Sequence, residues 1–374
     1  MGCLGKKLIV MINKGLKRVF LLTVLGPLVL FGEKFNQQRD LLNTGKFFKF
    51  IKRLKLDEKK RLQNSAFIEK VIPVKIADFP TAYNASIIPF KGYYLLAFRI
   101  DRYRLPLAQN LEHFRNYIGV VLLNNYFEPI QKPVLLYELG NRCYDPRLFE
   151  KGGRIYISYG SAYEGDADGV SRSRINLVEI DYKHGEFVLG KSVAMKLKNI
   201  RKFEKNWSIF SYDDELFYTY QIQPHKVLSV DPAHGFCKEI ALTDTPFEWK
   251  FGELRGGTPA LELQDCYLAF FHSGMWFLGR HFYFMGAYTF SKHPPFKILK
   301  MSADPFFYHE FYTSDRNPNI VSNVTFPGGY FAENGKIYLC YGENDAAVRI
   351  VVLDEKGLME SLEVVERGKN EMED

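Results

Sequence analysis

The sequence predicts an all-β protein, and three observations support this prediction. Phe, Tyr and Trp make up 16% of the 374 residues, and aromatic residues are enriched in strands. From about residue 70 onward, helical periodicity gives way to short runs of β-forming residues. Turn dipeptides separate these runs, a pattern typical of a β-propeller, a large sandwich or a β-helix. A propeller is favoured, because its blades can diverge in sequence while the strand spacing persists.

The first 64 residues differ from the rest in charge. They hold 15 Lys and Arg against 4 Asp and Glu, a net charge of +11, and subtracting this from the total of +7 leaves −4 for the remainder. A nucleic-acid-binding domain would need a basic face on the fold itself, so the charge distribution argues against that class. A basic N-terminus suits an anionic membrane surface instead.

Two stretches of this segment predict helices. Residues 14–32 place three basic side chains before an apolar run of about 13 residues, the layout of a secretion signal or signal anchor. The run is shorter than the roughly 20 residues that span a bilayer. Residues 46–62 form a basic amphipathic pattern that can rest on a membrane or pack against the folded domain. We therefore expect a helical segment over 1–65, and either a membrane-associated or secretory location through residues 14–32 or a cytoplasmic one.

Turns that contain glycine separate the strand runs of the main domain. Dipeptides such as Lys91-Gly92 and Asn334-Gly335 precede runs that are rich in aromatic and β-branched residues. The sequence predicts one β-domain over 66–365 and a charged tail over 366–374. The clearest strand runs are 93–100, 118–123, 154–159, 215–222 and 336–341.

Six polar motifs interrupt the strands, many of them flanked by Pro or Gly. The inner strands of a propeller converge at one mouth of the central channel, so polar residues far apart in the sequence can meet there. A single motif of this kind is usually an ordinary turn, but six in series favour a functional site. In chain order they are Asn84 in FPTAYNASIIPF, Arg142-Cys143-Tyr144-Asp145-Pro146-Arg147, Glu204-Lys205-Asn206-Trp207, Arg255-Gly256-Gly257-Thr258-Pro259, Phe270-Phe271-His272-Ser273 and Tyr341-Gly342-Glu343-Asn344-Asp345.

This ordered series resembles glycoside hydrolase family 130 and the related mannosyltransferases and phosphorylases of glycosyltransferase family 108. The resemblance covers roughly residues 75–355 and is densest over 256–345. It implies a five-bladed β-propeller that acts on β-mannosides, often by phosphorolysis with inversion. The number of blades follows from the resemblance alone, since strand spacing does not count them.

The resemblance also implies roles for single residues. Asp145 would match the family's general acid, whose proton passes to the leaving oxygen through a sugar hydroxyl. The positions that would bind the sugar substrate are Asn84, Arg147, Asn206, Tyr283 and Asp345, and Tyr283 also matches the phosphate site. The positions that would bind phosphate or another anion are Lys205, Arg255 and His272.

Two departures from the family pattern remove basic residues. Phosphorylases of this group carry an Arg before a Pro, one strand after the basic-Asn motif, and here that position reads Gln223-Pro224. They also carry a Lys just before the glycine motif, where Glu253 and Arg255 are nearest. Fewer cations leave hydrolysis, or transfer from another donor, open beside phosphorolysis.

A carboxylic acid that donates a proton near neutral pH needs a raised pKa. Arg147 lies two residues after Asp145, and a neighbouring cation would lower the pKa of that carboxyl. We therefore expect Arg147 to turn away, toward a loop or an anion.

Three functions remain open on the sequence. The first is an inverting phosphorylase or hydrolase of β-mannosides. The second is a membrane-associated mannosyltransferase with a nucleotide-sugar or sugar-phosphate donor, and the third is a sugar-binding propeller without catalysis. Acidic residues at both Asp145 and Asp345 favour catalysis, since binding alone could use amides.

The expected partners are an oligosaccharide or glycoconjugate substrate and, through the N-terminal segment, a membrane surface. The charge distribution predicts no nucleic-acid partner. The five cysteines show no spacing typical of a metal site, so neither a metal nor a cofactor is expected. Inorganic phosphate or a sugar phosphate would be a co-substrate.

Overall fold

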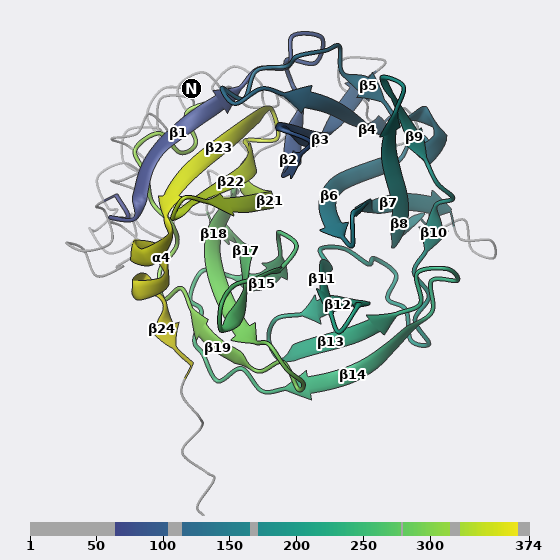
Figure 1. The fold of residues 1–374 in the computed structure, drawn as a ribbon. Helices are drawn as coiled ribbons and strands as arrows, with labels where there is room; N and C mark the ends of the chain where they lie inside the picture. The colour runs from purple at the N-terminus through teal and green to yellow at the C-terminus, as the bar shows by residue number, and fades with distance from the viewer. Residues whose placement is uncertain (1–63, 104–113, 165–170, 278–279, 315–321, 366–374) are drawn as a thin grey trace, which may run out of the picture. The chain divides into compact units, whose positions relative to one another are not determined.

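The computed structural model describes residues 64–103, 114–164, 171–277, 280–314 and 322–365. The predicted helices at the N-terminus and the charged tail therefore lie outside the described residues. Within the described part, five mainly antiparallel sheets are arranged in a ring, as Figure 1 shows. The predictions of an all-β protein and of a five-bladed propeller are confirmed. None of the helices in these ranges is long and apolar enough to cross a membrane.

Each sheet forms one blade, and the first strand of each blade lies nearest the channel (Figure 1). Blade 1 contains β2 (Tyr83–Phe90), β3 (Tyr93–Tyr103), β4 (Phe114–Leu123) and β5 (Val134–Leu135), followed by a 3-10 helix at Tyr137–Leu139. Blade 2 contains β6 (Cys143–Lys151), β7 (Arg154–Glu164), β8 (Ser171–Lys183), β9 (Glu186–Leu189) and β10 (Val193–Ala194). Blade 3 contains β11 (Ser208–Tyr212), β12 (Glu215–Gln221), β13 (His225–Val230) and β14 (Cys237–Thr243).

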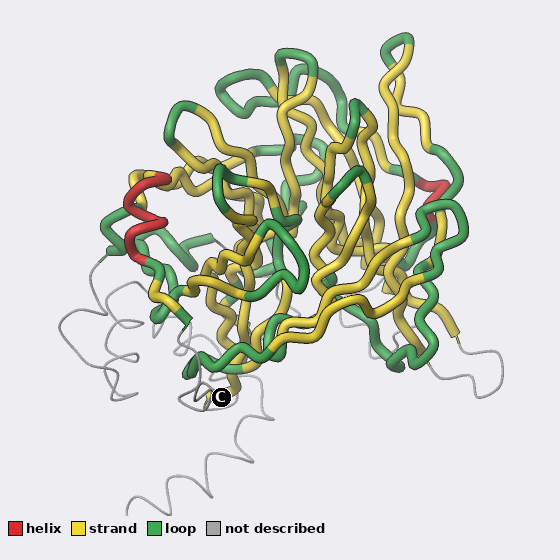
Figure 2. The backbone as a smooth tube through the Cα atoms, turned by 60° about the horizontal axis from the view of Figure 1, so that its bottom comes forward, coloured by secondary structure: helices red, strands yellow, loops and turns green. Residues whose placement is uncertain are grey.

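The last two blades include strands from both ends of the domain. Blade 4 contains β15 (Glu253–Gly256), β16 (Leu261–Glu262), β17 (Cys266–Phe277), β18 (Arg280–Ser291), β19 (Ile298–Met301), β20 (Ser322–Asn323) and β24 (Glu363–Val364). Blade 5 contains β21 (Thr325–Glu333), β22 (Lys336–Glu343), β23 (Ala347–Asp354) and β1 (Ile68–Val74), and helix α4 (Glu355–Ser361) follows β23. Figure 2 shows α4 as a short helix at the periphery of the strands.

The ring closes through a pair of strands that are remote in the sequence. Strand β1, the first of the domain, pairs antiparallel with β23 of the last blade, with Ile72 opposite Ile350. In Figure 1 the purple β1 and the yellow β23 lie side by side. This pairing places the first strand of the domain in the last blade and so joins the two ends of the domain.

The hydrophobic core lies between neighbouring blades. Ile87 and Phe98 of blade 1 pack with Cys340 and Ile350 of blade 5 in one buried cluster. Blades 1 and 2, and blades 2 and 3, share further clusters of the same kind. Fully burying one large apolar side chain stabilises a fold by about 1.5–3 kcal/mol, so these interfaces fix the order of the blades. The interface of blades 3 and 4 is aromatic, with Phe210, Phe217, Tyr267, Phe290 and Phe296 in ring contact.

Strand direction determines where the polar motifs meet. Within each blade successive strands are antiparallel, so the start of the first strand, the end of the second and the start of the third lie at one end. Asn84 and Asp145 lie at the starts of β2 and β6, and Asn206 lies just before the start of β11. Asp345 lies between the end of β22 and the start of β23. These residues therefore share one mouth of the channel.

Candidate active site

Asn84 and Asp145 lie on β-bulges at the start of two inner strands. The pairing of β2 with β3 shifts register across Asn84, and the pairing of β6 with β7 shifts across Asp145. Both residues have a left-handed backbone conformation, with φ values of 45° and 53°. A bulge turns a side chain out of the regular ladder, and such strained backbone is found preferentially at functional sites. The interruptions of the strand pattern in the sequence therefore correspond to bulges that set the directions of these two side chains.

Asp145 is held by an amide and a guanidinium. Its Oδ1 accepts a hydrogen bond from Asn84 Nδ2 at 2.9 Å and pairs with Arg99 Nη1 at 3.2 Å. The Arg99 guanidinium lies over the rings of Tyr83 and Tyr144, 4.8 and 5.6 Å from their centroids. Aromatic faces attract a cation, so these rings stabilise the guanidinium beside the carboxylate. Arg99, which no sequence motif marks, is thus the described cation that pairs directly with the Asp145 carboxylate.

Asp101 anchors Arg99 from the same face of β3. Its carboxylate accepts from Arg99 Nε at 2.9 Å, and from the Tyr83 hydroxyl and the Asn116 amide at 2.5 Å each. Side chains at i and i+2 share one face of a strand, so the pattern Arg99-Ile100-Asp101 indicates an ion pair on one face of β3. The signal is weak, because paired charges near a strand end usually face solvent.

The turn between β22 and β23 carries Asp345. Asn344 and Asp345 both have left-handed backbone, with φ values of 53° and 52°. The turn is fixed by Glu343, whose buried carboxylate accepts the backbone N–H groups of Thr313 and Ser314, at 3.1 Å each. No hydrogen bond from the described residues reaches the Asp345 carboxylate, so it is available to a ligand.

The two carboxylates have opposite electrostatic surroundings. Burial alone would raise the pKa of Asp145, but Arg99 and the hydrogen bond from Asn84 lower it below its usual value. Burial raises the pKa of Asp345 from 3.8 to about 7, with Arg99 opposing the rise and Asp145 adding to it. The raised pKa that a resting acid needs near neutral pH therefore belongs to Asp345 and not to Asp145. Because the two groups interact, they titrate as a pair.

Arg147 is directed at the glycine motif. Its side chain is buried, and its guanidinium donates to the backbone carbonyl of Gly257, to that of Gly256 at 3.4 Å and to Asn206 Oδ1 at 3.4 Å. It also donates to the backbone carbonyl of Asp145 at 3.1 Å, away from the carboxylate. The protein itself uses most of the Arg147 N–H groups, which agrees with the expectation that Arg147 turns away from the Asp145 carboxylate toward a loop, and its role in substrate binding stays a prediction. Arg147 thereby positions the glycine segment that follows β15 in blade 4.

Lys205 and Arg255 line one cavity of about 400 Å³. Asn206 and Gly256 line the same cavity, and both accept hydrogen bonds from the Arg147 guanidinium, so the cavity lies at the same mouth of the channel as Asp145. Lys205 is exposed and has no ion pair with a described carboxylate, whereas Arg255 pairs with Glu253 at 3.0 Å. Small-molecule sites commonly have volumes of roughly 300–1,000 Å³, and two cations make this one suited to an anion.

His272 and Tyr283 lie next to Arg255, on β17 and β18. Their rings are stacked, with centroids 5.8 Å apart, and Tyr283 interacts with the Arg255 guanidinium. Burial lowers the pKa of His272 to about 3, with Arg147 and Arg255 contributing. His272 is therefore neutral near pH 7. A neutral imidazole can still offer an anion a hydrogen bond, so the predicted anion-binding role of His272 stays a prediction.

Gln223, one of the two departures from the family pattern, has a structural role. Its Nε2 donates to the carbonyls of Thr245 at 2.9 Å and Phe247 at 2.7 Å. The side chain holds this neighbouring segment in place and is not among the residues that line the cavity.

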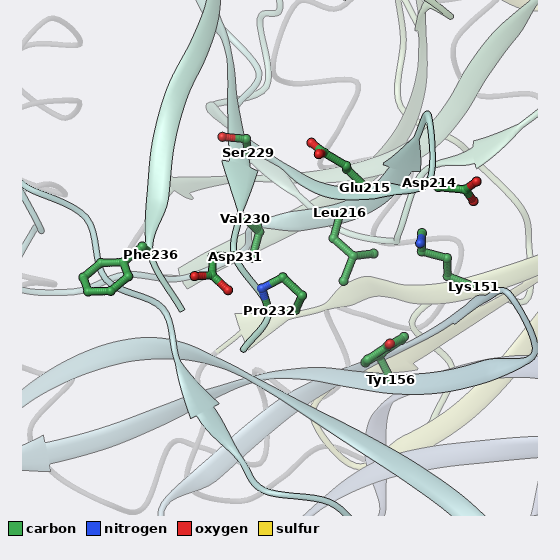
Figure 3. Close-up of a pocket in the computed structure, with 10 residues that line it drawn as sticks. All are labelled: Lys151, Tyr156, Asp214, Glu215, Leu216, Ser229, Val230, Asp231, Pro232 and Phe236. Carbon is green, nitrogen blue, oxygen red and sulfur yellow. The ribbon is translucent and has the colours of Figure 1, made fainter. Parts of the chain in front are cut away.

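A second cavity, of about 470 Å³, lies between blades 2 and 3 (Figure 3). Its residues come from the end of β6 and the start of β12, so it lies at the opposite end of the strands from Asp145. Asp214, Glu215 and Asp231 line it against a single cation, Lys151. This acidic lining does not suit a phosphate, and it leaves the cavity beside Asp145 as the better anion site of the two.

The raised pKa of Asp345 predicts a pH-dependent stability. Between about pH 4 and pH 7 the native state holds a proton on Asp345 that the unfolded chain has released, so this group lowers the free energy of unfolding as pH rises through that window. Asp345→Asn should remove this contribution. The measurement is urea unfolding of both proteins at pH 5 and pH 7.5. We expect the free energy of unfolding of the variant, relative to that of the wild type, to be larger at pH 7.5 than at pH 5. An equal difference at both pH values would contradict the raised pKa.

The fold and the site define a carbohydrate-active propeller, with carboxylates and cations at one mouth of its channel. The model of glycoside hydrolase family 130, described as β-1,4-mannooligosaccharide phosphorylase, matches residues 58–364. The chain therefore belongs to this family, and it is an enzyme of the β-mannoside phosphorylase and hydrolase type that acts on oligosaccharides. A search of the curated proteins found no match in sequence.

Solved structures with the same fold are distant in sequence. A glycosyl hydrolase from Bacteroides ovatus has a TM-score of 0.56 at 15% identity, with 79% of this chain and 93% of that chain covered. A β-1,2-mannobiose phosphorylase from Listeria innocua has a TM-score of 0.54 at 15% identity, with 81% and 95% covered. MPT-4, a mannose phosphorylase from Leishmania mexicana, has a TM-score of 0.52 at 9% identity, with 80% and 92% covered. At these identities the three structures support the fold.

Proposed function

We propose that this protein is an inverting mannoside phosphorylase, which transfers a mannosyl unit between an oligosaccharide and inorganic phosphate. The observation that carries this proposal is the cavity lined by Lys205 and Arg255, at the mouth of the channel that also holds Asp145. Inverting transfer needs an acid on one face of the sugar and a nucleophile on the other. Phosphate in this cavity would be the nucleophile, and the two cations would neutralise its charge.

Asp145 is the proposed general acid, and Asp345 is the residue that holds the proton before substrate binds. A sugar hydroxyl bound between the two carboxyl groups can accept the proton of Asp345 and donate its own proton to Asp145. This exchange leaves Asp345 ionised and Asp145 protonated. The raised pKa of Asp345 and the absence of a described hydrogen bond to its carboxylate support its role as the group that holds the proton.

The chemical step then balances without a further reagent. A phosphate oxygen attacks C1 as the C1–O bond to the leaving sugar breaks, and the leaving oxygen takes the proton from Asp145. Inversion converts a β-mannoside into α-mannosyl phosphate and a shortened saccharide. The reaction needs no cofactor, because it involves only substitution and proton transfer. Asn84 orients Asp145, and Tyr283 and His272 offer hydrogen bonds to the phosphate.

A donor assay tests this function. The purified protein is given β-1,2- and β-1,4-mannobiose with and without phosphate, and nucleotide-linked mannose in a parallel reaction. We expect cleavage of a mannobiose only when phosphate is present. Release of free mannose without phosphate would identify a hydrolase, and consumption of the nucleotide sugar alone would identify a transferase. Either result contradicts the proposal.

Variants of the cation pair sharpen the same test. Lys205→Ala and Arg255→Ala should each raise the KM for phosphate by roughly 10–100-fold, since a charge-assisted hydrogen bond is worth about 1.5–3 kcal/mol. The KM for the saccharide should change little. A matched control is Lys151→Ala, because Lys151 lines the acidic cavity at the other end of the strands. Equal effects of all three changes would contradict a specific anion site.

A further inference from the structure

Arg201 lines the same cavity as Lys205 and Arg255, although no sequence motif marks it. It belongs to the segment before β11, and its side chain is exposed. Three cations therefore surround one cavity of about 400 Å³. An orthophosphate ion, with five heavy atoms, leaves room in such a cavity for the sugar carbon that it attacks.

The Arg201 guanidinium is held in place before any ligand binds. Its Nη2 donates to Gln221 Oε1 at 3.1 Å, and the guanidinium carbon lies 4.9 Å from the centroid of the Tyr220 ring. The backbone N–H of Arg201 donates to Glu204 Oε1 at 2.6 Å, which fixes the start of the segment. A pre-positioned guanidinium loses less conformational entropy when it binds an anion than a freely moving one does.

The carboxylates of this cavity do not neutralise Arg201. Glu204 is buried, and its oxygens accept hydrogen bonds from Trp207 Nε1 at 3.1 Å and from the Tyr220 hydroxyl at 3.2 Å. Glu253 pairs with Arg255. Among the described residues no carboxylate forms an ion pair with Arg201, so its charge is available to a ligand in the cavity.

We propose that Arg201 is a further phosphate-binding residue, which with Lys205 and Arg255 makes a wall of three cations and favours phosphate over water as the nucleophile. This inference rests on the proposed function. It also accounts for how the cavity remains cationic while Gln223 binds backbone carbonyls elsewhere. Arg201 acts on the nucleophile alone and takes no part in proton transfer.

The test uses the full chain and three variants. Arg201→Gln removes the charge, and Arg201→Lys keeps a point charge without the planar fork. Lys202→Gln is the matched control, because Lys202 is the adjacent exposed cation and does not line the cavity. Calorimetric titration with inorganic phosphate gives Kd, and phosphorolysis of a mannobiose gives the phosphate KM and kcat.

For Arg201→Gln we expect the Kd and KM for phosphate to rise about tenfold, which corresponds to about 1.4 kcal/mol, with kcat changed less than twofold. Arg201→Lys should recover part of this loss, and the control should match the wild type. The inference is overturned if the wild type does not bind phosphate, if Arg201→Gln binds it unchanged, or if the control loses as much affinity. Weakened phosphate binding without any phosphorolysis would sink the proposed function and keep Arg201 as an anion ligand.

Discussion

Asp145→Asn is expected to lower turnover by roughly 10²–10⁴-fold while leaving sugar binding in place. The amide keeps the size of the carboxyl group and can still accept the hydrogen bond that Asn84 donates. It cannot carry the proton that the leaving oxygen needs. The measurement is kcat on a mannobiose with saturating phosphate, together with the affinity for the saccharide by calorimetry.

A matched control separates this effect from a general loss of charge. Asp231→Asn changes a carboxylate of the acidic cavity at the opposite end of the strands, and it should leave kcat unchanged. If the protein bound sugars without catalysing a reaction, Asp145→Asn would change only the affinity for the saccharide. Full activity of the Asp145→Asn protein would remove the assignment of the general acid.

Asp345→Asn is expected to change the pH profile as well as the rate. In the wild type the carboxylate pair keeps one proton up to about pH 7, so kcat/KM should fall as pH rises through that value. In the variant the proton depends on Asp145 alone, whose pKa is lowered. Activity at pH 7 should therefore drop by about 10²-fold or more, and it should recover as the pH is lowered.

The decisive observation is the basic limb of that profile, measured as kcat/KM from pH 4 to pH 9. If the Asp345→Asn protein keeps a limb near pH 7, another group carries the proton and the paired mechanism is wrong. If the limb disappears and activity at pH 7 is unchanged, Asp345 titrates but takes no part in proton delivery.

The sequence predicted the residues that break the strand pattern. Asn84 and Asp145 lie on bulges, and Asp345 lies on a turn with left-handed backbone, so each interrupts the alternation of apolar and polar residues that a regular strand shows. Such interruptions can be read from a sequence. They predict where a site is built, and the structure does bring these residues to one mouth of the channel.

The sequence did not predict the partners that set the chemistry. Arg99 and Asp101 sit within an apparently ordinary strand, and their effect on Asp145 depends on contact between blades 1 and 2. The neutral state of His272 follows from burial, which no local pattern reveals. The direction of the Arg147 side chain depends on its contacts with the carbonyls of Gly256 and Gly257 in another blade, which no local pattern reveals.

The closure of the propeller could not be predicted from local sequence patterns either, because it depends on a long-range contact. Strand β1 pairs with β23, about 280 residues further along the chain, and no turn signal records a contact of that range. The strand runs and glycine turns established the β class, and the family resemblance supplied the count of five blades.

The measurement that tests the central claim most directly is the configuration of the first product, followed by ¹H NMR during cleavage of a β-mannobiose in phosphate. The account predicts that α-mannosyl phosphate forms first and in equal amount to the shortened saccharide, since one phosphate attacks C1 from the face opposite the leaving oxygen. Formation of β-mannosyl phosphate, or of free mannose with phosphate left unconsumed, would contradict inverting phosphorolysis at this site.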